Sequence, residues 1–249
     1  VDTMKDILFF SPINPKTLKD EFIERFESLI LSGHFKPGEY VPSERELGEM
    51  FGVSRPVVHD GLRTLEHRGL VTIESRKGVK VNDYRKEGSI ELLLSILNYS
   101  GMNLAPSFFD SLLEMRILFE VEAAGKAALR GTEQQIQELE EIIKREKALT
   151  RYLPIEFSTL DYQFHLSIAL ASGNEIFPLL LNSFKRIYMT ILERFYTDDS
   201  TIPHIITLHE SLAQSIKNHD EQKAKADMEQ ILVYGEKQLR NQLSTASKK

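Results

Sequence analysis

Asp161, His165 and His209 are the residues of this sequence best suited to binding or proton-transfer chemistry. Asp161 and His165 are four positions apart in a segment with helical spacing, so they share one helix face with Phe164 and Ile168. Polar groups among core residues need partners. The sequence has no cysteine, which excludes thiol catalysis and leaves histidines and carboxylates as the good metal ligands. A metal-assisted hydrolase built on these residues would also need a general base and an oxyanion site, which the sequence does not reveal.

The segment over residues 43–81 has a second pattern, which is typical of DNA recognition. Ser43 and Glu46 have the spacing of a capping box, so a helix is predicted to begin there. Ser54 is predicted to begin a second helix. Alternating apolar residues on both sides of residues 74–78 then predict a hairpin with a polar, basic tip. Helix, turn, helix and basic wing in this order indicate a DNA-binding domain.

The side chains at the start of the second helix and at the hairpin tip are of the types that contact DNA. Ser54 and Arg55 lie at a helix N-terminus, which can enter the major groove and face base edges or phosphates. Arg76 and Lys77 lie where a wing would meet phosphates or the minor groove. Arg45 is placed to clamp a backbone phosphate. In the alternative interpretation, Ser54 only caps its helix and the charged residues are ordinary solvated side chains.

The segment PSERELGEMFGVSRPVVHDGLRTLEHRGLVTI resembles the winged-helix domain of the GntR family of bacterial transcription regulators. KVNDY after the wing and LDYQFHLSIALASGN at residues 160–174 resemble the FadR (FCD) branch of that family, so the resemblance covers about residues 15–240. In the family, the positions that match five residues of this chain contact operator DNA: Arg45, Ser54, Arg55, Lys77 and Gly78. The family usually has Arg where this chain has His59, which is shorter and mostly neutral at pH 7, so a different base preference is implied there.

The charge distribution limits the kind of nucleic-acid contact. The 249-residue chain has a net charge of −6, and residues 1–85 contain 13 Lys and Arg against 14 Asp and Glu. A DNA-contacting surface must therefore be local, which favours a specific and salt-sensitive contact. The sequence has no signal-peptide pattern and no apolar run long enough to span a bilayer, so a cytoplasmic protein without membrane contact is expected.

The spacing of apolar residues predicts a mostly α-helical protein with two domains. Residues 1–82 are predicted to form a winged helix-turn-helix domain with a small β wing, and residues 83–88 a linker. Residues 89–249 are predicted to form an all-α bundle for effector binding and dimerisation. About seven helices are expected in this bundle: 89–99, 106–129, 133–150, 155–171, 175–197, 203–217 and 221–243.

The resemblance also implies a metal site in the helical domain. In the larger FadR branch, Asp and His at the positions of Asp161 and His165, with two later histidines, hold a divalent metal that binds a small carboxylate. His209 matches the first later histidine, but the second falls near Ile231, which cannot bind a metal. Either a metal such as Zn, Ni or Mn is held by three protein ligands, or His165 and His209 are core histidines hydrogen-bonded to Asp161 or to the backbone.

Two classes of effector follow from the resemblance. The fatty-acid-responsive member of the branch lacks the metal histidines and binds long-chain acyl-CoA, and this chain resembles it in KVNDY, ALASGN and the Tyr234–Gly235 pair. Acyl-CoA is therefore expected first, and a small hydroxy or dicarboxylic acid at a metal-assisted site is the alternative. The expected pocket residues are Arg116, Glu120, Tyr188, Arg194, Tyr234 and Gly235. The aromatic stripe Phe177, Phe184 and Phe195 either lines this pocket or forms plain core.

Taken together, these features predict an effector-responsive regulator rather than an enzyme. A homodimer would place two recognition helices about one DNA turn apart on a near-palindromic operator. An effector that binds the helical domain better in a non-DNA-binding arrangement would then lower operator occupancy.

Overall fold

The computed structural model describes residues 17–100, 106–149 and 153–246. The chain divides into two compact units, Val1–Tyr99 and Ser100–Lys249. Residues 1–16 of the predicted N-terminal domain and residues 247–249 of the predicted bundle lie outside the described residues. Within the described ranges, no helix combines the length and the apolar character that crossing a bilayer requires.

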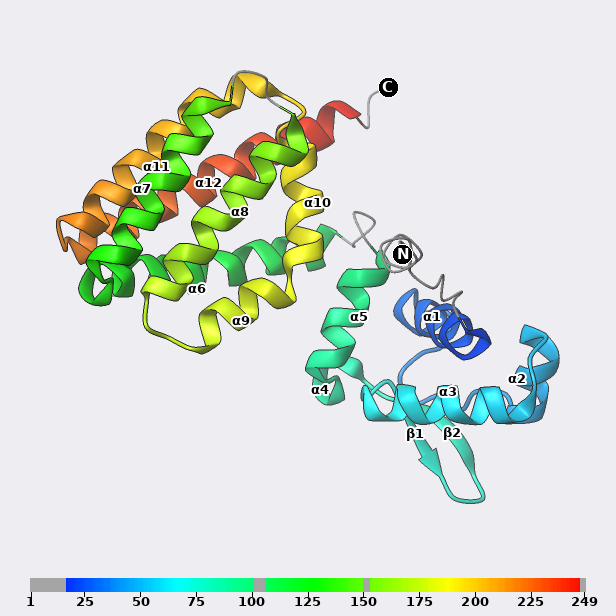
Figure 1. The fold of residues 1–249 in the computed structure, drawn as a ribbon. Coiled ribbons are helices and arrows are strands. Elements are labelled where there is room, and N and C mark those ends of the chain that lie inside the picture. The colour runs from blue at the N-terminus through cyan, green and yellow to red at the C-terminus, as the bar shows by residue number, and fades with distance from the viewer. Residues whose placement is uncertain (1–16, 101–105, 150–152, 247–249) are drawn as a thin grey trace, which may run out of the picture. The chain divides into compact units, whose positions relative to one another are not determined.

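Helices and one hairpin build the first unit (Figure 1). In chain order its elements are α1 (Leu18–Leu31), α2 (Glu44–Phe51), α3 (Arg55–His67), β1 (Val71–Glu74), β2 (Gly78–Val81), α4 (Tyr84–Glu87) and α5 (Ile90–Ser100). A capping box at Ser43 begins α2, as the sequence predicts, and a second one at Thr17 begins α1. Gly52 ends α2 with a left-handed φ of 66°, which lets the chain turn directly towards α3.

The hairpin and the packing of α1 on α3 complete the predicted winged helix-turn-helix fold. β1 and β2 pair antiparallel, from Val71 opposite Val81 to Glu74 opposite Gly78. Helix α3 approaches α1 so closely at Gly61 that an added Cβ would lie 2.4 Å from a ring carbon of Phe22. A side chain at Gly61 would therefore force the two helices apart. The fold class predicted for this part of the chain is confirmed.

Helix α5 is attached to the first unit through hydrogen bonds between Ser95 and a buried ion pair. Arg68, which follows α3, donates from Nη1 to Glu27 Oε2 at 2.7 Å and to Ser95 Oγ of α5 at 2.9 Å. Glu27 is only 1% exposed. The structure thus places α5 with the first unit, whereas the sequence analysis expected a linker at residues 83–88 and the start of the bundle at residue 89. Most of that expected linker is the short helix α4.

The second unit is all helical over its described residues, as predicted. Its helices are α6 (Pro106–Arg130), α7 (Glu133–Ala148), α8 (Pro154–Ala171), α9 (Ile176–Ser183), α10 (Lys185–Phe195), α11 (Ile202–Lys217) and α12 (Glu221–Ala246), with the 3-10 turn η2 (Asp199–Thr201) before α11. The single helix expected over residues 175–197 is in fact two. The helix is interrupted at Phe184, which has a φ of −93° and a ψ of 0° and whose side chain is buried.

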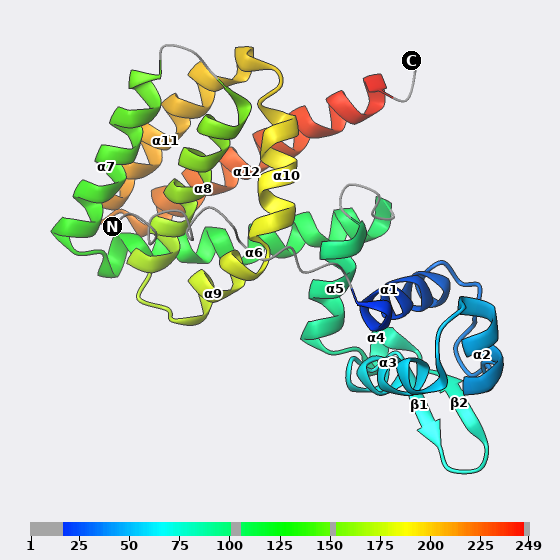
Figure 2. The ribbon, with the colours of Figure 1, turned by 45° about the vertical axis from the view of Figure 1, so that its right-hand side comes forward.

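Helix α8 is surrounded by other helices of the second unit. It packs against α6, α7, α9 and α10, while α12 runs along α6 and α11 (Figures 1 and 2). Because α8 is covered on several sides, its buried residues lie all around the helix rather than along one stripe. The polar residues of α8 are therefore held in the interior of the unit.

Candidate functional site

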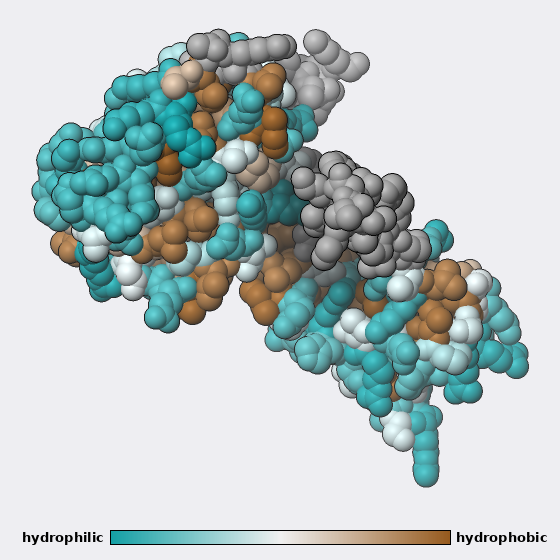
Figure 3. Space-filling model, in the orientation of Figure 1, coloured by the Kyte–Doolittle hydropathy of each residue, from teal (hydrophilic) through white to brown (hydrophobic). Residues whose placement is uncertain are grey.

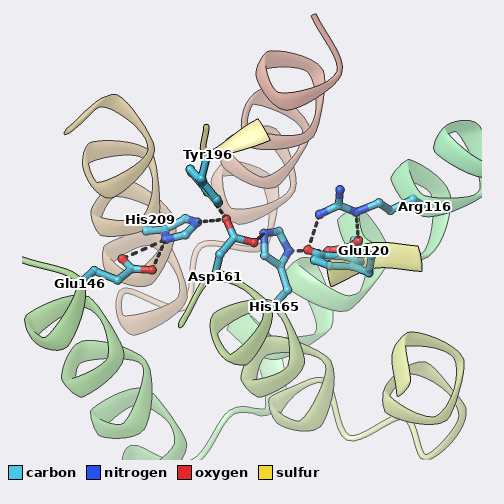
Figure 4. A network of polar contacts seen from close by, with 8 residues as sticks. Arg116, Glu120, Glu146, Asp161, His165, Tyr196 and His209 are labelled. Atoms are coloured by element: carbon cyan, nitrogen blue, oxygen red, sulfur yellow. Dashed lines mark hydrogen bonds and ion pairs between the residues drawn. The ribbon is translucent and has the colours of Figure 1, made fainter. Parts of the chain in front are cut away.

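A buried cluster of three polar side chains lies between α8 and α11. Asp161 and His165 come from α8, and His209 comes from α11 (Figure 4). Their exposed fractions are 3%, 2% and 0%. One nitrogen or oxygen atom from each residue can be chosen so that all three atoms lie within 4.8 Å of one another. The structure thus brings together the three residues that the sequence analysis proposed as metal ligands.

Two glutamates fix the orientation of the two imidazole rings. Nδ1 of His165 contacts Glu120 Oε2, and Nδ1 of His209 lies 3.0 and 3.1 Å from the carboxylate oxygens of Glu146. An ionised carboxylate only accepts hydrogen bonds, so Nδ1 of each ring donates. In the neutral rings, the lone pair is then on Nε2. Each Nε2 atom lies 3.9 Å from an oxygen of Asp161. A carboxylate behind the histidine is the usual support of a metal-bound imidazole.

Two atoms of the cluster have no hydrogen-bond partner among the described residues, namely Asp161 Oδ1 and His209 Nε2. A buried polar atom without a partner costs roughly 1–3 kcal/mol. One ligand atom from each of Asp161, His165 and His209 lies within 4.8 Å of the others, so a cation among them would give these residues a common partner. Tetrahedral ligand atoms at about 2.0–2.2 Å from one ion are about 3.3–3.6 Å apart, so the observed 3.9 Å separations would shorten by a few tenths of an ångström when an ion binds. The donor set of two imidazoles and one carboxylate suits Zn, Ni or Mn.

The charges around the cluster are balanced by neighbours. Burial alone would raise the pKa of Glu120, but the positive charge of Arg116 and the contacts with Arg116 and His165 lower it to about 2. Burial likewise would lower the pKa of His209, but the charge of Glu146 and its hydrogen bond raise it above 6.5. Tyr196 donates its hydroxyl hydrogen to Asp161 Oδ2. Burial and the negative charge of Asp161 raise the pKa of Tyr196 well above 10.0, so the hydroxyl remains a donor.

A small cavity of about 40 Å³ opens beside the cluster. The polar residues at its wall include Asp161, His165 and Arg116, and its apolar wall includes Ile231. A second cavity of about 30 Å³ shares Arg116 with the first and is otherwise lined mainly by apolar side chains of α6, α9 and α10. Arg116 therefore lines both cavities, and the first has Asp161 and His165 in an otherwise mainly apolar wall.

The structure brings together most, but not all, of the expected pocket residues. Arg116 bonds to Glu120 and to the hydroxyl of Tyr188, and Gly235 lines the first cavity. Tyr234 instead packs against His204, with ring centroids 4.5 Å apart. Of the aromatic stripe, Phe195 lines the first cavity, Phe184 lines the second and Phe177 packs against Phe119. Arg194 lies on α10 and is not among the residues that line either of these two cavities.

Glu146, which contacts His209 from α7, was not predicted as a site residue from the sequence. Glu146 follows Ile142 and Ile143 by four and three positions, so it lies on the apolar stripe of α7 and is fully buried. A glutamate on the buried face of an otherwise amphipathic helix is a signal that could have been noticed, because a buried carboxylate needs a partner. Its partner, 63 positions later, could not be read from the sequence.

The residues proposed for DNA contact lie on α2, in the N-terminal part of α3 and at the hairpin tip. Ser54 is the N-cap of α3 but its side chain makes no capping hydrogen bond, so its hydroxyl is not used by the helix. The side chain of Arg55 is 75% exposed and that of His59 is 47% exposed, four positions further along α3. Both contact the carboxylate of Glu44. Arg45, on α2, is highly exposed and lies 3.4 Å from Glu49.

The hairpin tip is a tight basic turn. Arg76 adopts a left-handed φ of 65° and Gly78 a φ of 111°, which the short connection requires. Lys77 is 71% exposed and lies 3.3 Å from Glu74. The tip projects from the first unit and has a hydrophilic surface (Figure 3). Its shape and charge fit contact with phosphates.

A winged helix-turn-helix unit joined to an all-helical unit with a buried polar cluster is an architecture that suits an effector-responsive transcription regulator. Residues 18–81 match the family "Bacterial regulatory proteins, gntR family", and residues 111–233 match the FCD domain. The chain belongs to the GntR family and carries an FCD domain. These families contain transcription regulators, so the chain is a DNA-binding transcriptional regulator and not an enzyme.

Individual relatives agree with this assignment. The HTH-type transcriptional regulator Mce2R of Mycobacterium tuberculosis is 28% identical over 221 residues, which are 89% of this chain and 91% of that protein. The Fatty acid metabolism regulator protein of Proteus mirabilis is 28% identical over 207 residues, 83% of each chain. A solved structure of Lar, described as controlling the Listeria monocytogenes agr system, has the same fold with a TM-score of 0.54, at 17% identity over 92% of this chain and 99% of that chain.

Proposed function

We propose that this regulator binds operator DNA as a homodimer in the cytoplasm and that a small organic acid, bound at a divalent metal in the second unit, controls its DNA affinity. The proposed metal ligands are Asp161, His165 and His209. One observation carries this proposal: two imidazole Nε2 atoms and one carboxylate converge in the protein interior, and two of these atoms have no other partner. The proposed DNA contacts are Arg45, Ser54, Arg55, His59, Arg76, Lys77 and Gly78.

The environment of the cluster suits a small anionic effector. A bound divalent ion would supply concentrated positive charge for a carboxylate group. Three protein ligands leave coordination positions for effector oxygens. Arg116 lines the same cavity, and guanidinium groups bind carboxylates well. The small volume of the cavity favours an organic hydroxy or dicarboxylic acid over a long acyl chain.

Acyl-CoA is the second candidate effector. It is favoured by the relatives of this chain that are named as regulators of fatty acid metabolism, at 27–29% identity. The apolar cavity next to Arg116 would have to open to admit an acyl chain. An acyl-CoA effector would not require the metal.

The two candidates are separated by one set of measurements on the full chain. The protein is loaded with Zn, Ni or Mn, the excess metal is removed, and the bound metal is measured by elemental analysis. The shift of the unfolding temperature is then measured with organic acids and with acyl-CoAs, each with and without a chelator. One metal per chain, and stabilisation by an acid only in the metal-loaded protein, are expected. Failure to retain any metal, with stabilisation by acyl-CoA in the presence of chelator, would overturn the metal-assisted site.

The DNA-binding proposal has its own test. Arg55→Ala is expected to weaken specific operator binding by about 1–3 kcal/mol, measured by gel shift on a duplex selected from a randomised library. Coupling of ~1–3 kcal/mol between effector and operator would change operator affinity by roughly 5–150-fold, which is sufficient for a switch. Ser54, Arg55 and His59, in the N-terminal part of α3, form what we call the reading face. Unchanged operator binding by the Arg55→Ala protein would reject this face as the DNA-contacting surface.

A further inference from the structure

The first residue of α2, Glu44, holds two residues of the recognition helix α3 at once. Nε of Arg55 donates to Glu44 Oε2 at 3.0 Å, and Nδ1 of His59 lies 2.7 Å from Glu44 Oε1. The Glu44 side chain is 21% exposed, far less than Arg55 or His59. A carboxylate behind the reading face thus contacts two side chains on that face.

This contact determines where the hydrogen of the His59 ring is. The hydrogen bond from His59, together with that from Arg55, lowers the pKa of Glu44, so its carboxyl group is ionised at neutral pH. An ionised carboxylate has no hydrogen to donate, so Nδ1 of His59 must be the donor. In the neutral ring, Nε2 then has no hydrogen and can only accept. The ring of His59 therefore offers its exposed side as a hydrogen-bond acceptor.

We propose that Glu44 is a specificity-determining residue, which makes His59 a hydrogen-bond acceptor for a base amino group and directs Arg55 at a guanine. In the major groove, the amino groups are N6 of adenine and N4 of cytosine, whereas guanine offers only the acceptors N7 and O6. The bond from Glu44 uses Nε of Arg55, which leaves the two terminal Nη groups for guanine O6 and N7. This inference rests on the proposed DNA-binding face.

The spacing of the two residues gives the expected operator pattern. Arg55 and His59 are four positions apart, which is about 6 Å along a helix axis. Stacked base pairs are about 3.4 Å apart. The guanine read by Arg55 and the adenine or cytosine read by His59 should therefore lie one or two base pairs from each other. An Arg in place of His59 would instead donate, and would select a second guanine.

A plain structural role for Glu44 makes a different prediction. If Glu44 only links α2 to α3, its loss lowers stability or overall affinity but leaves the base preference opposite His59 unchanged. The proposed role changes the preference itself. Glu44→Gln is informative because the amide can donate as well as accept, so it no longer dictates which His59 nitrogen has the hydrogen.

The test is selection of bound duplexes from a randomised library by the full-length protein, followed by sequencing. The wild type is compared with E44Q, H59R and H59Q, and with E49Q as the matched control. Glu49→Gln removes the same charge from the same helix, but Glu49 contacts Arg45 rather than α3. The wild type is expected to prefer adenine or cytosine at the His59 position by about tenfold. E44Q is expected to lose that preference, H59R to select guanine, and E49Q to retain the wild-type preference.

A second measurement observes the ring directly in the wild-type protein. The ¹⁵N chemical shifts of the His59 ring in the wild type, assigned by comparison with H59Q, distinguish a protonated from an unprotonated nitrogen. We expect hydrogen on Nδ1 and none on Nε2 in neutral solution. Hydrogen on Nε2, or selection of guanine or thymine by the wild type, would overturn the role of Glu44. If H59Q and the Arg55→Ala protein select the same sequences as the wild type, the reading face itself is wrong, and the two failures are thereby distinguished.

Discussion

The Nε2 atom of His209 lies 3.9 Å from Oδ2 of Asp161. This separation is too long for a hydrogen bond, but it is within a few tenths of an ångström of the separation of two atoms that bind one ion. His165 Nε2 lies at the same distance from the other oxygen of Asp161. Glu120 and Glu146 contact the Nδ1 atoms of His165 and His209, so the Nε2 atoms of both rings are directed towards Asp161. Asp161, His165 and His209 therefore have the arrangement of metal ligands rather than that of hydrogen-bond partners.

The first prediction is that His209→Gln abolishes tight metal binding. The substitution removes one of three protein ligands, and the remaining two cannot hold a divalent ion firmly. Metal content after loading and gel filtration, measured by elemental analysis, is expected to fall from one ion per chain to almost none. His204→Gln is the control, because His204 lies on the same helix but is exposed and packs on Tyr234. Retention of a full equivalent of metal by the His209 variant would contradict the assigned ligand.

The second prediction concerns Glu146, which contacts His209 but not the proposed ion. Glu146→Gln keeps the shape of the side chain but weakens its hold on the ring, so the metal affinity is expected to fall by about 10–100-fold. Isothermal titration calorimetry with Zn measures this change. Glu140→Gln is the matched control, since Glu140 lies on the same helix α7 and pairs with Lys217 at the surface. Equal zinc affinities of the two variants would show that Glu146 does not support the ligand.

The parts of this site that could be predicted from the sequence are the local ones. Asp161 and His165 share a helix face because they are four positions apart, and any helix over that segment brings them together. The start of α2 follows from Ser43 and Glu46 for the same reason, since a capping box is made by residues three positions apart. The structure confirms the capping box, and it places Asp161 and His165 together in one buried cluster.

The parts that could not be predicted depend on packing between distant segments. Glu146 meets His209 only because α7 packs on α11, and the spacing within either helix contains no sign of this. The attachment of α5 to the first unit depends on a contact between Arg68 and Ser95, 27 positions apart. The interruption at Phe184 could not be predicted either, because the apolar spacing over 175–197 continues through it.

A third prediction follows from the buried carboxyl group of Glu27. Burial raises the pKa of Glu27 above 4.5, although Ser95 and Arg68 oppose the shift. The folded state therefore holds the proton more tightly than the unfolded state. The stabilisation from this difference is complete below the unfolded value of 4.5, and it is lost as the pH rises through the folded pKa.

Glu27→Gln removes this titration, because an amide does not ionise. The free energy of unfolding of the wild type relative to the variant is therefore expected to decrease as the pH rises from 4 towards 7. Calorimetric unfolding of both full-length proteins at a series of pH values measures the difference and cancels the titration of all other groups. A difference that increases with pH would mean that Glu27 is stabilised as the charged form, with its pKa lowered.

The last prediction separates phosphate contacts from base reading. Lys77 lies at the exposed hairpin tip, where a lysine would neutralise one phosphate and release a counterion. Lys77→Ala is expected to weaken binding to all duplex sequences alike and to reduce the slope of log affinity against log salt by about one. Fluorescence anisotropy with selected and scrambled duplexes at several salt concentrations measures both quantities. Lys144→Ala, which removes an exposed lysine of α7 paired with Glu141, should leave the slope unchanged. If Lys77→Ala changed the preferred sequence but not the slope, the wing would be reading bases rather than the backbone.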